Sequence, residues 1–262
     1  MSPSNARRRQ LQKLAQRRAE ERRRQRRRRI LTTVIALVVA AGGGTLLFFT
    51  FTGEDDTTGP TAGPTPGPSS TVQCDFTAPP AAGEEKRTFA RAPKNTLQPN
   101  KTYTAVMETS CGTIELELFA NEAPNTVNSF VFLARQKFFD GLTFHRVVKD
   151  FVIQGGDPTG DGTGGPGYKT VDAPPEGTTY VAGDLAMAKA EAEAPGTAGS
   201  QFFLVTGNPG PLNAQPDYAL IGRVVSGLDV ARTIEQLPAA GGATDGAPEQ
   251  PVYITSVRIV VE

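Results

Sequence analysis

Alternating apolar and polar residues dominate the second half of the chain. In GTIELELF, Ile114, Leu116 and Leu118 alternate with polar residues, which is the period-two pattern of a half-buried strand. The preceding stretch TYTAVMETS is expected to pair with it through a tight turn at Cys111-Gly112. TFHRVV and FVIQGG predict a second hairpin that turns at Lys149-Asp150. The other predicted strands are VAGDLAMA, QFFLVT, YALIGRV and VYITSVRIVV.

Two stretches change to helical spacing. PNTVNSFVFLARQ, which starts at Pro124, places apolar residues at i, i+3, i+4 and i+7 on one face, and its proline suits a first turn. SGLDVARTIEQLP opens with an S-x-x-D start signal at Ser226 and Asp229, and Pro238 ends it. Many short strands with two helices predict a mainly β domain, built as a closed or nearly closed β-barrel whose ends the helices cover.

The N-terminal part has a different pattern. A run of 22 uncharged residues, ILTTVIALVVAAGGGTLLFFTF, starts at Ile30. Because it is long enough for a hydrocarbon core of about 30 Å, we predict a transmembrane helix over residues 30–52. The preceding residues 1–29 hold thirteen of the 27 Lys and Arg residues and only two of the 27 acids. Positive flanks stay in the cytoplasm, so we expect a single-pass cell-membrane protein with a cytoplasmic N-terminus and an extracytoplasmic remainder.

Two other interpretations of this region stay open. Ala40-Ala41-Gly42 resembles the small-residue end of a cleavable signal peptide, although the apolar run resumes after it and favours a retained anchor. The arginine run of residues 1–29 is also typical of a nucleic-acid-binding arm. The adjoining apolar span makes membrane topology the simpler explanation, so we expect no nucleic-acid partner.

Residues 53–100 have the composition of a tether. GPTAGPTPGPSS, within this segment, is rich in Pro, Gly, Ser and Thr and contains no large apolar residue. Such a segment cannot bury enough surface to offset the entropy of ordering it, and its prolines make it extended and semi-stiff. We predict that it holds a folded domain, residues 101–262, away from the membrane. That domain is long enough to fold on its own.

Both cysteines, Cys74 and Cys111, come after the predicted span. Because exported proteins meet oxidising conditions, we predict one disulfide between them, which would link the late tether to the start of the folded domain. The alternative is two unpaired cysteines. With one histidine and no CxxC motif, the sequence predicts no metal site.

The stretch FHRVVKDFVIQGGD concentrates the candidate chemistry. It holds the single histidine, His145, next to Arg146, in an apolar run that ends at Gln154. A catalytic histidine needs an orienting acid and a nucleophile, which nothing local supplies, so a hydrogen-bonded structural histidine is the preferred interpretation. An arginine among apolar residues is costly to bury without partners. Strand alternation places Phe144 and Arg146 on one face, where an arginine, a glutamine and aromatic rings are typical of a small-ligand or peptide groove.

The glycine-rich segment GDGTGGPGY contains G-x-G-x-x-G at Gly162, Gly164 and Gly167. This motif signals a dinucleotide fold only between a strand and a helix. Pro166 interrupts it and no helical pattern follows, so we predict a surface loop with positive-φ turns instead.

Four motifs in order, FHRVVKDFVIQGGD, GDGTGGPGY, LAMAKA and GSQFFLVT, resemble those of the cyclophilin-type peptidyl-prolyl cis-trans isomerases. The resemblance covers about residues 102–261. It implies an eight-stranded antiparallel barrel capped by two helices and an active groove on the outer barrel face. It also implies a monomeric catalytic domain that acts on proline-containing polypeptides without cofactor or metal. With its arginines, span and tether, the whole chain resembles a membrane-anchored bacterial member, of actinobacterial type, that assists the folding of exported proteins.

The resemblance implies roles for individual residues. Arg146 takes the catalytic position, where its guanidinium stabilises the twisted amide, and Gln154 holds a backbone group of the peptide. The residues expected around the substrate are Phe151, Val152, Gln154, Ala188, Phe203, Leu212 and Tyr218, with His145 as a neighbour.

Three positions depart from the family pattern. Lys189 stands where many members have asparagine, Pro211 where cyclosporin-sensitive members often have tryptophan, and Tyr218 where histidine is frequent. These departures keep a second interpretation open, in which the domain is a catalytically weak proline-peptide-binding module or chaperone. They also predict weakened cyclosporin binding.

Overall fold

The structure is a computed structural model that describes residues 72–262. The predicted Arg-rich segment (1–29), transmembrane helix (30–52) and first part of the tether (53–71) lie outside the described residues. None of the helices within residues 72–262 combines the length and the apolar character that crossing a membrane requires.

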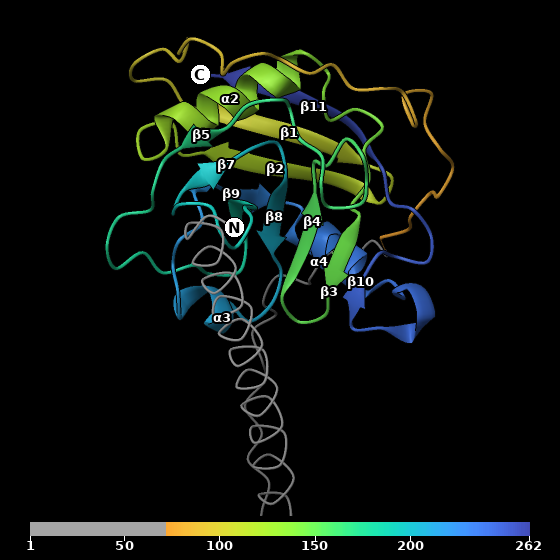
Figure 1. The fold of residues 1–262 in the computed structure, drawn as a ribbon. Helices are drawn as coiled ribbons and strands as arrows, with labels where there is room; N and C mark the ends of the chain where they lie inside the picture. The colour runs from red at the N-terminus through yellow and green to blue at the C-terminus, as the bar shows by residue number, and fades with distance from the viewer. Residues whose placement is uncertain (1–71) are drawn as a thin grey trace, which may run out of the picture. The chain divides into compact units, whose positions relative to one another are not determined.

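Strands make up most of the regular structure, with a few helices between them (Figure 1). In chain order the elements are β1 (Tyr103–Thr109), β2 (Gly112–Leu118), α2 (Pro124–Arg135), β3 (Arg146–Val148), β4 (Val152–Gly155), β5 (Thr170–Val171), β6 (Asp184–Met187), β7 (Thr197–Ala198), β8 (Phe202–Val205), α3 (Gly210–Asn213), β9 (Leu220–Ser226), α4 (Leu228–Gln236), the 3-10 turn η1 (Ala240–Gly242), β10 (Asp245–Gly246) and β11 (Ile254–Val261).

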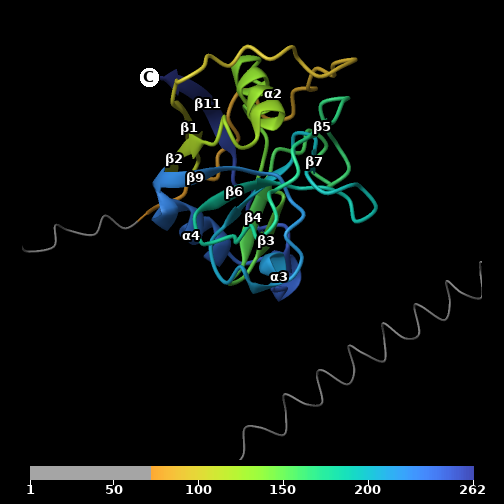
Figure 2. The ribbon, with the colours of Figure 1, turned by 90° about the vertical axis from the view of Figure 1, so that its left-hand side faces the viewer.

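Nine strands form one antiparallel sheet in the order β10-β3-β4-β8-β6-β9-β2-β1-β11, and β5 pairs with β7 separately. The large sheet curls into a half-barrel (Figures 1 and 2). Backbone hydrogen bonds join the segment before β3 to residues at and just before the start of β11. In one of them the Phe144 N–H donates to the Val252 carbonyl at 2.9 Å. The predicted mainly β architecture is confirmed. The expected count of eight strands is wrong, because a two-residue strand, β10, adds to the edge at β3.

Both predicted hairpins are present. Thr109 pairs with Gly112, so the β1–β2 turn is made by Ser110 and Cys111, one residue earlier than predicted. Val148 pairs with Val152 across the predicted β3–β4 turn, in which Asp150 has a φ of 57°. An aspartate tolerates this left-handed conformation better than most side chains.

Helices α2 and α4 lie towards opposite ends of the curl (Figure 2). The apolar face predicted for α2 is buried, and the Asp172 carboxylate accepts a hydrogen bond from the Thr126 N–H at 2.6 Å in its first turn. The predicted S-x-x-D start of α4 is wrong, because Ser226 still belongs to β9 and Gly227 is the N-cap, with a φ of 82°. A side chain at Gly227 would collide with the Thr113 carbonyl, so glycine is required there.

The two faces of the curled sheet carry separate apolar clusters. The inner face forms the main core, which includes Leu185, Leu204 and Ile153, all 0% exposed. The outer face of the same strands carries a second cluster that includes Val152 and Phe203. Because side chains alternate along a strand, each of the strands β4, β6 and β8 contributes to both clusters. The outer cluster is the base on which the candidate site is built.

Residues 72–100, called here the strap, differ from the predicted tether. They have almost no regular structure, but Val72, Phe76, Phe89 and Leu97 pack against the main core. Phe89 contacts Phe132 of α2 with ring centres 5.0 Å apart. The tether prediction was therefore wrong for this part, because composition alone hid the few apolar residues that hold the strap to the domain.

A disulfide joins the strap to the β1–β2 turn. Cys74 and Cys111 are bonded, in agreement with the predicted pairing. Further along, the Asn128 side chain of α2 accepts a hydrogen bond from the Thr96 N–H at 2.9 Å and donates to the Lys94 carbonyl at 3.1 Å. The strap is thus fixed both covalently and by polar contacts with α2.

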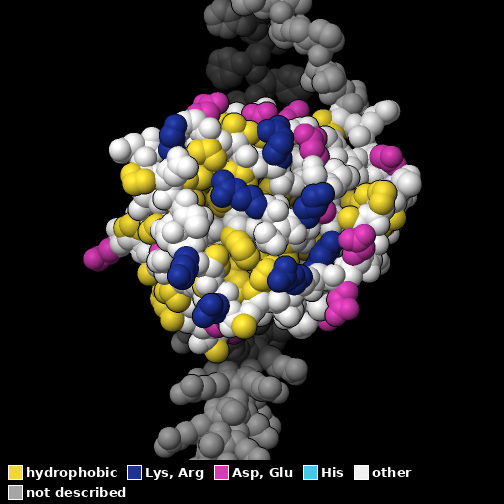
Figure 3. Space-filling model, turned by 90° about the horizontal axis from the view of Figure 1, so that it is seen from above, with side chains coloured by type: hydrophobic (Ala, Val, Ile, Leu, Met, Phe, Trp, Pro, Cys, Tyr) yellow, Lys and Arg dark blue, Asp and Glu magenta, His cyan; other side chains and the backbone are white. Residues whose placement is uncertain are grey.

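The outer side of the strap is polar. Figure 3 looks down on the side of the molecule that carries α2 and shows Lys and Arg side chains spread over this face. Arg87, Arg91 and Lys94 of the strap are exposed, whereas its large apolar residues pack against the main core. This one-sided pattern is that of a surface segment held down by a few anchors.

Candidate active site

The candidate site begins with a row of residues across neighbouring strands. Arg146 of β3 pairs with Gln154 of β4, Gln154 pairs with Phe203 of β8, and Phe203 pairs with Ala186 of β6. Residues directly opposite each other in a sheet project to the same face. Register therefore brings a cation, an amide and an aromatic ring together on the outer face.

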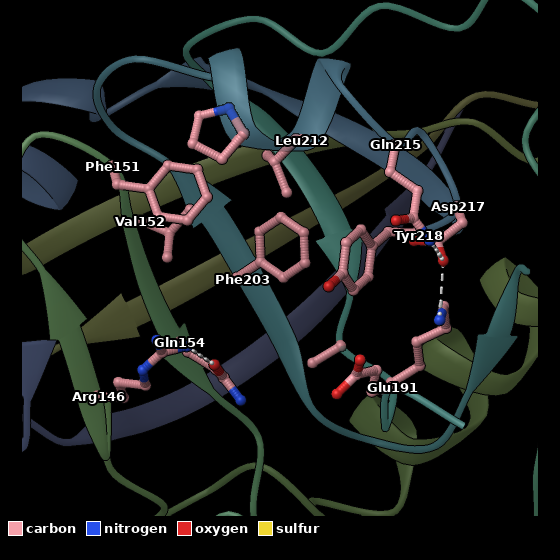
Figure 4. A pocket seen from close by; sticks show the side chains of 13 residues that line it. Arg146, Phe151, Val152, Gln154, Glu191, Phe203, Leu212, Gln215, Asp217 and Tyr218 are labelled. Atoms are coloured by element: carbon pink, nitrogen blue, oxygen red, sulfur yellow. Dashed lines mark hydrogen bonds and ion pairs between the residues drawn. The ribbon is translucent and has the colours of Figure 1, made fainter. Parts of the chain in front are cut away.

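This row borders a groove of about 540 Å³. Its lining residues are Arg146, Phe151, Val152, Gln154, Ala188, Lys189, Glu191, Phe203, Pro211, Leu212, Gln215, Asp217 and Tyr218. Figure 4 shows Arg146 and Gln154 on one side of Phe203, and Asp217 and Tyr218 on the other. The groove is therefore apolar in the middle and polar at both ends, which suits an extended peptide with an apolar residue at its centre.

The apolar middle is formed by four side chains from three parts of the chain. Val152, Phe203 and Leu212 are 3%, 5% and 6% exposed, so little of their surface remains in contact with water. Phe151 precedes β4, at the end of its turn, and lines the groove from there. A small apolar ring placed against these side chains would be largely desolvated.

Arg146 is oriented by an ion pair. Its Nε and Nη2 atoms donate to the two carboxylate oxygens of Asp245 at 2.6 and 2.7 Å, and Nη1 donates to Gln154 Oε1 at 3.2 Å. A guanidinium has five N–H donors, so these contacts within the described residues leave two for a ligand. The hydrogen bond from Arg146 holds the pKa of the Asp245 carboxyl below its usual value, and the same contact raises the pKa of Arg146.

Arg146 is also accessible. Its side chain is 42% exposed, and it belongs to the groove lining rather than to the inner core. The bidentate contact with Asp245 fixes the plane of the guanidinium without burying it. The site thus presents a permanent positive charge in a set orientation beside an apolar surface.

Gln154 connects Arg146 to the glycine-rich loop. Its Nε2 donates to Gln201 Oε1 at 3.0 Å, and Gln201 Nε2 donates to the Gly162 and Gly164 carbonyls at 3.0 and 2.9 Å. Gly162 has a φ of 87° and Gly167 one of 91°, and no helix follows, so the predicted loop with positive-φ turns is confirmed. The loop supports the glutamines and does not form a nucleotide-binding turn.

The other end of the groove is charged as well. Lys189 Nζ lies 3.0 Å from Asp217 Oδ2, and the two side chains are 4% and 15% exposed. The Tyr218 ring meets Phe203 edge to face, with centres 5.3 Å apart. No group of three His, Cys, Asp or Glu side chains within residues 72–262 is arranged to hold a metal ion.

The groove brings together all the predicted substrate residues except His145. The histidine does not line it, and its two ring nitrogens are buried without a hydrogen-bond partner among residues 72–262. The prediction that His145 is a hydrogen-bonded structural histidine is therefore wrong. Burial lowers the pKa of His145, an effect that the Asp157 charge opposes.

The prediction that Phe144 and Arg146 lie on the same face of the strand is also wrong. Phe144 is 1% exposed and packs in the inner core, as does Val147. Strand β3 starts only at Arg146, so the alternation does not extend back through His145 to Phe144. Arg146 lies on the outer face, whereas Phe144 and Val147 pack in the inner core.

Comparison with known proteins identifies the family of the domain. The family model described as "Cyclophilin type peptidyl-prolyl cis-trans isomerase/CLD" matches residues 104–259. The chain belongs to the cyclophilin-type peptidyl-prolyl cis-trans isomerase family. Its homologues indicate the same enzyme class, a peptidyl-prolyl cis-trans isomerase.

Relatives of this cyclophilin-type domain are found among bacteria and eukaryotes. Peptidyl-prolyl cis-trans isomerase A of Mycobacterium tuberculosis is 41% identical over 182 residues, which are 63% of this chain and 96% of that protein. Peptidyl-prolyl cis-trans isomerase B of Bacillus subtilis is 48% identical over 123 residues, 46% of this chain and 82% of that protein. A crystal structure of a cyclophilin-type isomerase of Cryptosporidium parvum, 30% identical, superposes with a TM-score of 0.55 and covers 61% of this chain and 98% of its own.

Some residues that line this cyclophilin groove or hold its side chains were not singled out from the sequence. Asp245 lies 99 positions after Arg146 on a two-residue strand that has no apolar pattern, so no local signal marks it. Gln201 belongs to the motif GSQFFLVT, from which only Phe203 was assigned a role. Asp217 lies beside Tyr218 in a stretch without a regular pattern, and its pairing with Lys189 depends on the tertiary fold.

Proposed function

We propose that this protein is a membrane-anchored prolyl isomerase that accelerates X-Pro isomerisation in exported polypeptides, with Arg146 as its catalytic residue. The observation that carries the proposal is the oriented, accessible Arg146 guanidinium beside the apolar middle of the groove. In this arrangement a donor of fixed direction lies next to a surface that accepts a proline ring.

The chemistry needs few groups. An X-Pro bond rotates over a barrier of about 18–20 kcal/mol, because the amide is conjugated. At the twisted transition state the proline nitrogen becomes pyramidal and gains a lone pair. An Arg146 N–H directed at this nitrogen binds the twisted amide better than either planar isomer, and such differential binding lowers the barrier.

The remaining groove residues hold the substrate. Phe151, Val152, Phe203 and Leu212 form the apolar seat of the proline ring, and Gln154 holds a backbone group while the other side of the bond turns. Neither a nucleophile nor a cofactor is needed for this rotation. The related Cryptosporidium parvum protein was also crystallised in the presence of the dipeptide Ala-Pro, which supports a proline-containing ligand for this groove.

A coupled proline-isomerisation assay on the full chain in detergent tests the mechanism. We expect the parent to be active and Arg146→Ala to lower kcat/KM by about 10²–10³, the usual loss when a transition-state donor is removed. Lys137→Met, a change at an exposed position two residues after the end of α2, is the control and should leave the rate unchanged. A rate for Arg146→Ala within threefold of the parent would disprove the catalytic role.

The location of the domain is the second part of the proposal. The uncharged run from Ile30 and its arginine-rich flank support a retained anchor with the isomerase domain outside the cytoplasm. The Cys74–Cys111 disulfide supports an oxidising compartment, and the mycobacterial relatives support an actinobacterial source. In intact cells, externally added protease should remove the domain, whereas survival of the domain until the cells are lysed would argue for the opposite orientation.

Lys189, Pro211 and Tyr218 favour a second candidate, a peptide-binding module or chaperone of low turnover. The same assay separates the two. A parent no faster than the uncatalysed reaction that still binds proline peptides would identify the module.

A further inference from the structure

The end of the groove away from Arg146 contains a buried cation that the proposed mechanism does not use. Lys189 Nζ pairs with Asp217 Oδ2 at 3.0 Å, donates to the Glu193 carbonyl at 3.2 Å and lies 5.5 Å from the centre of the Tyr218 ring. The dashed line from Asp217 in Figure 4 marks the ion pair. An ammonium group has three donors, and here they meet a carboxylate, a carbonyl and a ring face.

The ion pair joins two segments that are distant in the sequence. Lys189 follows β6 and Asp217 precedes β9, and these two strands are neighbours in the sheet. A backbone hydrogen bond from the Gly196 N–H to the Asp217 carbonyl, at 2.7 Å, joins the same segments. Together the two contacts hold the segment after β6 against the segment before β9 at this end of the groove.

Tyr218 is the groove residue that these contacts position. Its backbone is fixed by the buried Tyr180 hydroxyl, which accepts a hydrogen bond from the Tyr218 N–H at 3.1 Å and donates one to the Tyr218 carbonyl at 2.6 Å. Its ring is fixed by two neighbours, Phe203 at 5.3 Å between centres and Lys189 at 5.5 Å. Phe203 also belongs to the proline seat, so the position of the Tyr218 ring is coupled to the middle of the groove.

The pair is stable only when both partners are present. A buried charge that loses its partner is strongly unfavourable and moves towards water. Without Lys189, the Asp217 carboxylate would keep only the hydrogen bond that Gln215 Nε2 donates to Oδ2 at 3.2 Å, and the Tyr218 ring would lose one of its two supports. The groove would then widen at the end where residues next to the proline are expected to bind.

We propose that Lys189 is a positioning residue for peptide binding, which acts through Asp217 and Tyr218 to fix the end wall of the groove. This inference rests on the proposed function and adds a specificity determinant at the opposite end from the catalytic arginine. Lys189 touches the wall and not the reacting bond, so its loss weakens substrate binding and leaves the rotation step intact.

Steady-state kinetics on the full chain test this role. We compare the parent with Lys189→Met, Asp217→Asn, the double variant and the control Lys137→Met, using a proline-containing tetrapeptide. Each single change at the pair should raise KM about tenfold, the size expected for coupling between contacting residues, with kcat within twofold. The double variant should be no worse than Lys189→Met alone, and the control should match the parent.

A purely structural role for the pair gives a different result. It would lower the melting temperature and leave KM unchanged, and that outcome overturns the proposal. A fall in kcat at constant KM, or a double variant whose effect is the product of the two single effects, also overturns it. If Lys189→Met does not fold, Lys189→Gln, which keeps a polar donor, takes its place and should give an intermediate KM.

Failure of the proposed function can be recognised separately. If the parent shows no isomerase activity, the same variants are titrated with a fluorescent proline peptide. Weaker binding by Lys189→Met than by Lys137→Met then supports the positioning role, and equal binding overturns it.

Discussion

The direction in which the Arg146 guanidinium points depends on Asp245, so we expect Asp245→Ala to reduce isomerase activity without abolishing it. The carboxylate accepts from two guanidinium nitrogens at 2.6 and 2.7 Å. Asp245 also belongs to β10, which pairs with β3 next to Arg146. Alanine removes the carboxylate and leaves the backbone pairing of β10 in place.

The size of the effect follows from the exposure of the pair. Arg146 and Asp245 are 42% and 50% exposed, so water screens their attraction. Exposed ion pairs contribute about 0.2–1 kcal/mol. If all of this energy orients the guanidinium for the transition state, kcat/KM falls between about 1.4-fold and fivefold. Gln154 still holds Nη1 in the variant, which is why the loss stays far below that of Arg146→Ala.

A coupled isomerisation assay of Asp245→Ala, Arg146→Ala and the double variant checks this reasoning. Asp229→Ala, at an exposed position on α4 that does not line the groove, is the matched control. The double variant should be as slow as Arg146→Ala alone, because Asp245 acts only through the arginine. A loss for Asp245→Ala as large as that for Arg146→Ala, or a gain in activity, would refute the orienting role.

Three further predictions concern other parts of the molecule. Replacing both cysteines, Cys74→Ser with Cys111→Ser, should lower the unfolding free energy by about 4 kcal/mol, because the bond closes a loop with a sequence separation of 37. Urea denaturation measures this, and a loss under about 1 kcal/mol would contradict it. Burial lowers the pKa of His145 below 6.5, so the unfolded chain binds a proton that the folded protein rejects, and stability should fall as the pH drops through about 6.5. The melting temperature of His145→Gln should therefore depend less on pH than that of the parent, and equal slopes would show that His145 is not responsible. Pro211 lines the groove and the chain has no tryptophan, so we expect weakened cyclosporin binding, which inhibition at low nanomolar cyclosporin would disprove.

The strands could be predicted from alternation, whereas most of the groove residues were implied by the resemblance to the cyclophilin-type family. Alternation specifies which residues of a strand share a face, and the motif around Gln154 and that around Phe203 fall on strands that pair. The positions of Val152 and Ile153 on opposite faces follow from the same rule. Where regular strand geometry ends, the rule fails, and Phe144 was accordingly assigned to the wrong face.

The remaining features depend on contacts that leave no local pattern. Asp245 and Arg146 meet through a strand of two residues, which is too short to show alternation. Lys189 could be recognised as unusual, but its partner Asp217 is defined only by the folding of β6 next to β9. The strap looked like a spacer because its composition is polar overall, while its attachment depends on single residues such as Phe89.

The disulfide between Cys74 and Cys111 has a mechanical consequence. A force applied to the chain before residue 74 would pass through the sulfur bridge into the β1–β2 turn. The strap residues after Cys74, 75–100, would be bypassed by that load. Tension on the N-terminal side would therefore not peel the strap from α2, and the groove would keep its shape on a domain that is pulled from one end.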